Sequence, residues 1–222
     1  MAYQKIKIRT KAKNDILDKN YAGKAFLIAK KLSSFFPKSP DLIVINVFEK
    51  RTKFLKAIKK KNAPNWLIGS IPSKSTSIVF FLNKEGKISK KTVQILTHEI
   101  AHLYINKNNP NLPNWIKEGL SVFLAKQIFS QTIKKESWEK IASTGIPFKQ
   151  IKWHFAAEHN GYDIAGLLVF FLIKKYGKKN FIETISSFKQ KTSIFEAFAR
   201  PSGKTQESLL RNFFDHFVKS YD

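Results

Sequence analysis

The sequence predicts an α+β protein, with a small mixed β-sheet lobe first and a mainly helical lobe after it. Two observations lead to this prediction. Over residues 1–87, stretches typical of strands and helices follow one another in the order strand, helix, strand, helix, strand, strand. Beyond residue 87, the apolar residues recur mostly at helical spacing. This order is typical of a small sheet packed against helices.

The length and composition indicate one folded domain. The chain has 222 residues, 43% of them hydrophobic and 20 of them Phe, which is enough for a substantial core. We therefore expect a single domain over residues 1–222. It would consist of a mixed sheet lobe (1–87), a pair of helices (88–128) and a helical lobe (129–222).

Local patterns define the elements of the sheet lobe. Alternating or continuous apolar runs bounded by Pro, Gly and polar turn residues indicate strands, and apolar residues at helical spacing indicate helices. We expect strands over residues 3–10, 41–48, 66–71 and 77–82, and helices over residues 18–36 and 52–60.

The next helix, expected over residues 93–104, carries the most informative pattern, His98-Glu99-Ile100-Ala101-His102. Histidines four residues apart on a helix lie on one face, with Cβ atoms about 5–6 Å apart, so both imidazoles can reach one metal ion. Glu99 lies beside them, where it can serve as a base. The apolar residues of this helix fall mainly on the opposite face. A catalytic zinc ion requires a third protein ligand and one open position.

Glu118 is the best candidate for the third ligand. An Asn- and Pro-rich turn over residues 106–114 separates the first helix from a second, which begins near Pro113 and is apolar at helical spacing to Leu124. Glu118 stands among these apolar positions. A carboxylate there is costly unless it has a partner, and a metal ion is such a partner. The chain has no Cys, so the metal ligands must be His or carboxylate.

Helices are expected over most of the remaining chain, namely residues 133–142, 162–177, 181–188, 194–198 and 206–217. Residues 143–160 read as irregular and contain His154 and His159. Each of these histidines is either a spare ligand or acid, or an ordinary solvated loop residue. His216 is interpreted as structural.

The pattern of His98-Glu99-x-x-His102, a short loop and Pro113-x-Trp115-x-x-Glu118-Gly resembles the gluzincin metallopeptidases, in particular the small peptidase-MA-like domains. The resemblance implies a zincin-like fold and one Zn²⁺ per chain. It also implies zinc ligation by His98, His102 and Glu118, with Glu99 as the general base.

Two further segments resemble this family. Trp66 and Gly69 match an aromatic-x-x-Gly segment, and the helix that begins at Tyr162 matches one that follows the zinc helices. The resemblance implies that Tyr162 donates a hydrogen bond to the oxyanion. A tyrosine that only packs at a helix start is the alternative. In the family one strand holds the substrate by backbone pairing. We assign this role to residues 77–82, with an ordinary buried strand as the alternative.

These observations predict a zinc metallopeptidase that hydrolyses peptide bonds in a peptide or protein substrate. The rival prediction is a weakly active or inactive peptidase-like protein that binds nucleic acid or an acidic protein through its basic surface. A third alternative is a zinc ion that only stabilises the fold. The sequence does not indicate an oligomeric state.

The net charge of +24 suggests an anionic partner, but only four of the 40 basic residues are arginine, and the lysines are scattered along the chain. A lysine-rich solvated surface with weak, non-specific polyanion binding therefore competes with a dedicated site. The longest apolar run, residues 164–173, is far below the roughly 20 residues of a membrane helix. Because no signal-peptide pattern is present either, we expect a cytoplasmic protein.

Overall fold

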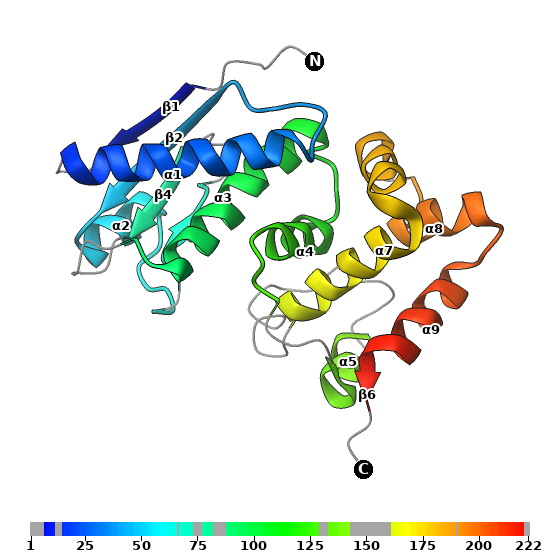
Figure 1. The fold of residues 1–222 in the computed structure, drawn as a ribbon. Helices are drawn as coiled ribbons and strands as arrows, with labels where there is room; N and C mark the ends of the chain where they lie inside the picture. Colours follow the sequence, from blue (N-terminus) through cyan, green and yellow to red (C-terminus); the bar gives the residue numbers. More distant parts are fainter. Residues whose placement is uncertain are drawn as a thin grey trace. The chain divides into compact units, whose positions relative to one another are not determined.

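The computed structural model describes residues 7–11, 15–65, 67–72, 77–81, 88–128, 133–142, 161–189 and 191–219. Figure 1 shows the order of the elements along the chain. The chain divides into two compact units, Met1–Asn108 and Asn109–Asp222. Strands and helices are both present, which confirms the mixed class predicted from the sequence, and helices predominate.

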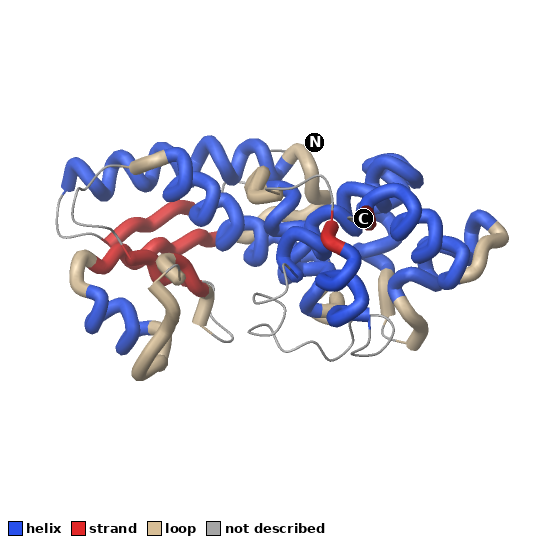
Figure 2. Tube along the Cα trace, turned by 90° about the horizontal axis from the view of Figure 1, so that it is seen from below, coloured by secondary structure: helices blue, strands red, loops and turns tan. Residues whose placement is uncertain are grey.

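The first unit is built on a four-stranded sheet. Its elements are β1 (Lys7–Lys11), α1 (Asp15–Ser33), β2 (Leu42–Phe48), α2 (Arg51–Ala57), β3 (Gly69–Ser70), β4 (Ser77–Phe81) and α3 (Lys90–Asn108). The strand order is β1-β2-β4-β3. Neighbours β1, β2 and β4 are parallel, and β3 is antiparallel to β4. In Figure 2, α1 and α3 cover one face of this sheet and α2 lies on the other side.

The core of this unit follows from the alternation in β2. Its residues are buried and half-buried by turns, with Ile43, Ile45 and Val47 inside. The register sets Ile45 opposite Ile78 and Val47 opposite Phe80. Tyr21 of α1 packs edge-on against Phe80, with ring centroids 5.9 Å apart. The apolar stripe predicted for the first helix is therefore the side that covers the sheet.

The sheet order corrects one prediction. Residues 77–82 were expected to hold substrate by backbone pairing, but β4 lies inside the sheet, with β2 on one side and β3 on the other. Phe80 and Val79 are already paired with Gly69 and Ser70. Within the described residues, the edge next to β4 is β3, which is much shorter than the strand predicted over residues 66–71.

The back of α3 is fixed to α1. Tyr104 is fully buried, and its hydroxyl donates a hydrogen bond of 2.8 Å to the carbonyl of Ala29 and lies 2.9 Å from Oγ of Ser33. At the end of α3, the amide of Asn108 pairs with the backbone N–H and C=O of Lys38. These contacts hold the helix on the sheet with the histidine face turned away from α1.

The second unit is mainly helical. Its elements are α4 (Asn114–Leu124), β5 (Ile133–Lys134), α5 (Lys135–Ala142), α7 (Gly161–Ser187), α8 (Ile194–Ala199), a 3-10 helix η1 (Arg200–Ser202), α9 (Gln206–Phe217) and β6 (Val218–Lys219). Gly177 inside α7 is not helical (φ 78°, ψ 153°), so α7 consists of two successive helices, as predicted. The parallel pairing of β5 with β6 was not predicted.

Helices α4 and α7 pack backbone to backbone. A Cβ at position 119 would lie 2.3 Å from the carbonyl oxygen of Ala165, so only glycine fits there. Gly166 in turn lies close to the side chain of Val122. Trp115 stacks on Phe195, with ring centroids 4.9 Å apart and planes 8° from parallel. Helix α4, which carries Glu118, is therefore packed tightly against α7 and α8 within the second unit.

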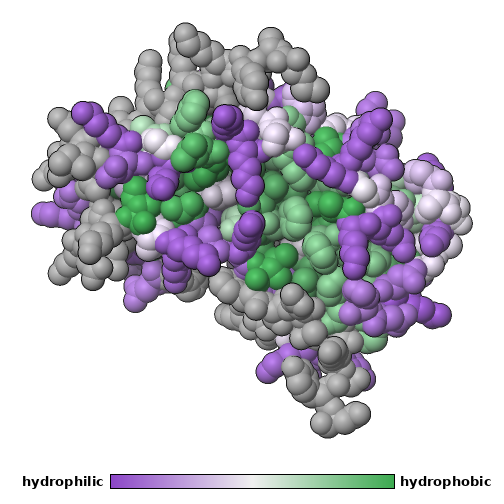
Figure 3. All heavy atoms as spheres, viewed as in Figure 1, coloured by the Kyte–Doolittle hydropathy of each residue, from purple (hydrophilic) through white to green (hydrophobic). Residues whose placement is uncertain are grey.

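Several predictions fall outside the described residues. These are the start of the first strand (residues 3–6), Trp66, the last residue of the strand 77–82, and the segment 143–160 with His154 and His159. Figure 3 shows hydrophilic side chains spread over the visible face, with apolar ones between them. That distribution agrees with lysines scattered along the whole sequence.

Candidate metal centre

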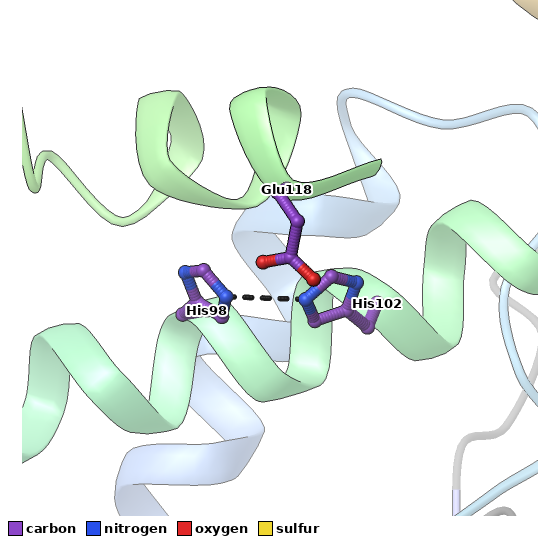
Figure 4. A group of neighbouring side chains, drawn as sticks. All are labelled: His98, His102 and Glu118. Atoms are coloured by element: carbon purple, nitrogen blue, oxygen red, sulfur yellow. Dashed lines mark hydrogen bonds between the residues drawn. The ribbon is translucent and has the colours of Figure 1, made fainter. Parts of the chain in front are cut away.

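Helix α3 presents both histidines on one face, as their spacing predicted. His98 and His102 are half-buried, and their rings have centroids 4.8 Å apart with planes at 70°. Their Nε2 atoms lie 3.1 Å apart (Figure 4). Two ring nitrogens at this distance either share a proton or share a metal ion.

Glu118 completes the group. Its carboxylate extends from α4 toward the two imidazoles in Figure 4. One ligand atom from each of His98, His102 and Glu118 lies within 4.8 Å of the others, and all three residues are half-buried. The structure therefore brings together the three residues expected to ligate a metal, which is compatible with one ion. Among the described residues, this is the one group of at least three His, Cys, Asp or Glu side chains with such geometry.

The donor set fits zinc. Zn–N bonds of about 2.0–2.1 Å at tetrahedral angles separate two ligand nitrogens by about 3.3–3.4 Å. The observed Nε2 separation of 3.1 Å is close to that value. No separation within the group of His98, His102 and Glu118 exceeds 4.8 Å. Two imidazoles and one carboxylate would leave the fourth position of a tetrahedral ion open.

Glu99 lies on α3 between the histidines but is more buried than either, with 8% of its surface exposed. It contacts the edge strand β3. A Cβ at position 69 would lie 3.0 Å from Cγ and 3.1 Å from Oε1 of Glu99. The absence of a side chain at Gly69 is therefore what lets β3 approach this carboxylate. Gly69 was noted in the sequence only as part of a family-like segment, and its contact with Glu99 was not predicted.

The segment before β3 is held by Arg51. Its guanidinium donates hydrogen bonds to the backbone carbonyls of Leu67, Ala63 (3.2 Å) and Pro64 (2.7 Å), and it lies 5.0 Å from the ring centroid of Phe54. Sequence analysis missed this residue. Its rarity was the available signal, because the chain uses lysine almost everywhere and arginine at four positions.

The surroundings of Glu118 are partly apolar and partly charged. The neighbouring Lys117 donates a hydrogen bond of 2.6 Å to the carbonyl of Pro110. Burial lowers the pKa of Lys117, and the negative charge of Glu118 acts in the opposite direction. Gly119, the next residue, is the point where α4 meets α7. The close helix contact therefore fixes the backbone that carries Glu118.

Tyr162 lies in the first turn of α7 and is half-buried. Ala165, one turn further along α7, contacts Gly119, so Tyr162 and the contact with α4 lie on neighbouring parts of one helix face. His216, interpreted as structural, is exposed in the last turn of α9, and its ring contacts Phe217.

No protein-family model matches the chain, and no curated protein matches it. Across the described residues, every helix is too short or too polar to cross a membrane.

Proposed function

We propose that this protein is a zinc-dependent metallopeptidase of the gluzincin type with a zincin-like fold. The observation that carries the proposal is the grouping of His98, His102 and Glu118 within 4.8 Å. Two independent parts of the sequence, a His-x-x-x-His helix and a separate Glu on α4, supply these ligands. Their convergence is the expected result of selection for one metal ion.

Zinc held by His98, His102 and Glu118 would supply a Lewis acid and would lower the pKa of a bound water to about 7. Glu99 is the residue assigned to proton transfer. Its carboxylate accepts a proton from the attacking water and then donates it to the leaving amine. Its burial on the helix that carries both histidines keeps this carboxylate in a fixed position beside them.

Substrate recognition is assigned to β3 in place of β4. The outer side of β3 ends the strand order among the described strands, and its Gly69 contacts Glu99. An extended peptide paired with this edge would bring its backbone next to the general base. Tyr162 is assigned as hydrogen-bond donor to the oxyanion of the tetrahedral intermediate. A donor of this kind contributes about 2.7–4 kcal/mol to transition-state stabilisation.

The proposal is tested by metal analysis together with digestion of a peptide library, with and without chelator. We expect about one zinc per chain and cleavage that chelator abolishes. Glu99→Gln should keep the zinc and lower kcat by about 10²–10⁴, because it removes the general base. Glu118→Ala should weaken zinc binding itself, because it removes a ligand.

Glu183→Gln on the exposed part of α7 is the matched control and should change neither zinc content nor activity. A chain that binds no zinc after reconstitution contradicts the proposal. Unchanged cleavage by Glu99→Gln contradicts the assignment of the base. Salt-sensitive binding to nucleic acid without cleavage of any peptide would favour the alternative of a peptidase-like binding protein.

A further inference from the structure

The outward face of α1 exposes two large apolar side chains. Phe26 is 58% exposed and Leu27 is 60% exposed, and no other large apolar residue among those described exceeds 37%. The opposite face of the same helix is fully used by the core, through Tyr21, Ala25, Ile28, Ala29 and Leu32. Phe26 and Leu27 therefore have no role in packing α1 on the sheet.

Lysines surround these two residues. Lys19, Lys24, Lys30 and Lys31 are all exposed. At 100° per residue they fall, with Phe26 and Leu27, in one arc of the helix. The sequence contains no acidic residue from position 19 to position 40. Figure 3 shows apolar and hydrophilic residues side by side over α1. This face thus combines apolar anchors with positive charge.

We propose that the outer face of α1 binds the surface of an anionic lipid membrane. Lying in the plane of the interface, the helix would insert Phe26 and Leu27 at the boundary between headgroups and acyl chains. The four lysines would extend their apolar stems along that boundary and place their ammonium groups among anionic headgroups. Gly23 lies on the same face, with nothing within 4 Å of the place where a Cβ would stand, so it does not obstruct a close approach.

Other occupants fit this face less well. Nucleic acid would use the lysines but leaves the two exposed apolar side chains unexplained. A second copy of the chain would set four lysines against four lysines. Two apolar side chains on one convex helix also provide little of the roughly 1,200 Å² that stable protein interfaces bury. A membrane surface combines weak apolar and electrostatic contributions, which matches the composition of the face.

The test is co-sedimentation of the full chain with vesicles. We expect binding to vesicles of equal parts phosphatidylcholine and phosphatidylserine, and little binding to phosphatidylcholine alone. A variant with Gln in place of Lys19, Lys24, Lys30 and Lys31 should bind at least about tenfold more weakly. Each lysine near an anionic surface contributes a factor of about five to the membrane affinity. Phe26→Ala with Leu27→Ala should also reduce it at least about tenfold, because it removes the inserted side chains.

The charge-matched control changes four exposed lysines outside α1 to Gln together, namely Lys178, Lys179, Lys189 and Lys191. This variant should bind vesicles nearly as well as the wild type. Circular dichroism and zinc content should be the same in all variants. Loss of binding to the same degree in the control would overturn the proposal, because it would indicate non-specific attraction by net charge. Absence of binding to phosphatidylserine vesicles would overturn it as well. Dimers of the wild-type chain would also overturn the proposal if Phe26→Ala with Leu27→Ala dissociated them, because a second copy would then cover this face. Analytical sedimentation detects such dimers.

Discussion

Two fully buried tyrosines of the first unit differ in whether their hydroxyl groups are satisfied. The hydroxyl of Tyr104 is hydrogen-bonded to Ala29 and Ser33. The hydroxyl of Tyr21 is buried against the sheet without a hydrogen-bond partner among the described residues. A buried polar group without a partner costs free energy, so the Tyr21 hydroxyl works against folding.

Tyr21→Phe should therefore leave the free energy of unfolding unchanged or raise it by up to about 1 kcal/mol at neutral pH. Burial raises the pKa of Tyr21 from 10.0 to about 12. Because the folded-state pKa is the higher one, the wild-type chain loses stability as the pH rises from about 10 to about 12. The Tyr21→Phe variant has no hydroxyl at this position and should not show this loss of stability. Urea titrations at neutral and alkaline pH measure both effects.

Tyr104→Phe is the matched comparison and should lower the free energy of unfolding by about 0.5–1.5 kcal/mol, because it leaves the buried carbonyl of Ala29 with one hydrogen bond fewer. Equal effects of the two substitutions would contradict the account, because the difference between them rests on hydrogen bonding alone.

At the scale of single residues, the sequence predicted the grouping of His98, His102 and Glu118 well and the surroundings of this group poorly. The spacing of His98 and His102 fixes their common face on any α-helix, and the apolar neighbours of Glu118 marked it as exceptional. The contact of Glu99 with Gly69 joins residues that are distant in the chain, and local periodicity contains no information about it.

At the scale of elements, the close contact of α4 with α7 leads to a stability prediction. Gly119→Ala should lower the free energy of unfolding by about 2–3 kcal/mol or more, because its Cβ would lie 2.3 Å from a backbone carbonyl that cannot move alone. Thermal or urea unfolding measures the loss, and zinc affinity should fall with it.

Gly23→Ala is the control for this substitution. Position 23 is helical and has nothing within 4 Å of an added Cβ. The change should raise the free energy of unfolding by about 0.5–1 kcal/mol, as expected for Gly to Ala in an unobstructed helix. A mild effect of Gly119→Ala, similar in size to that of Gly23→Ala, would show that the α4–α7 contact is looser than described.

The position of β3 depends on Arg51, which leads to a prediction on activity. Arg51→Lys replaces a planar donor to three carbonyls by a single ammonium group. If the chain is a peptidase, kcat/KM should fall roughly tenfold to a hundredfold through misplacement of β3 beside Glu99, while zinc content stays unchanged. Arg200→Lys, at an exposed arginine paired with Glu196, is the control and should have no effect. Loss of zinc by Arg51→Lys would contradict a role confined to β3.

The elements with a long buried face were predictable, and the short strands were not. Helix α1 and strand β2 each carry a continuous apolar pattern over their length. The segment 66–71 looked like a full strand, but Arg51 binds carbonyls at positions 63, 64 and 67. Of the described residues 67–71, only Gly69 and Ser70 join the sheet. The pairing of β5 with β6 joins two-residue strands far apart in the chain, which no local pattern reveals.

At the scale of the whole molecule, the net charge of +24 should make stability depend on salt. Repulsion among the lysines opposes the folded state, and salt screens it over about 10 Å at 0.1 M. We expect Tm to rise with sodium chloride at constant zinc. An uncharged osmolyte at equal osmolality is the control. A Tm that falls as salt is added would indicate that attractive pairs outweigh the repulsion.

The place where the chain divides is a feature of the whole molecule that the sequence did not predict. Two compact units meet in sequence between Asn108 and Asn109, inside the predicted helix pair (88–128). Each asparagine is fixed within its own unit. Asn108 pairs with Lys38, and the buried amide of Asn109 donates to the carbonyls of Ile185 and Phe188. The Asn- and Pro-rich segment looked like a simple turn because its partners are distant in the chain.

The two-residue length of β3 also affects how the protein behaves at high concentration. An exposed sheet edge is a template for aggregation in proportion to the length of unpaired backbone that it offers. Gly69 and Ser70 offer too little backbone to start a continuous intermolecular ladder, and the lysine-rich surface adds repulsion between copies. An edge of this size can pair with one short extended segment without itself starting a fibril, so we expect any intermolecular pairing of this sheet at its other edge, the five-residue strand β1.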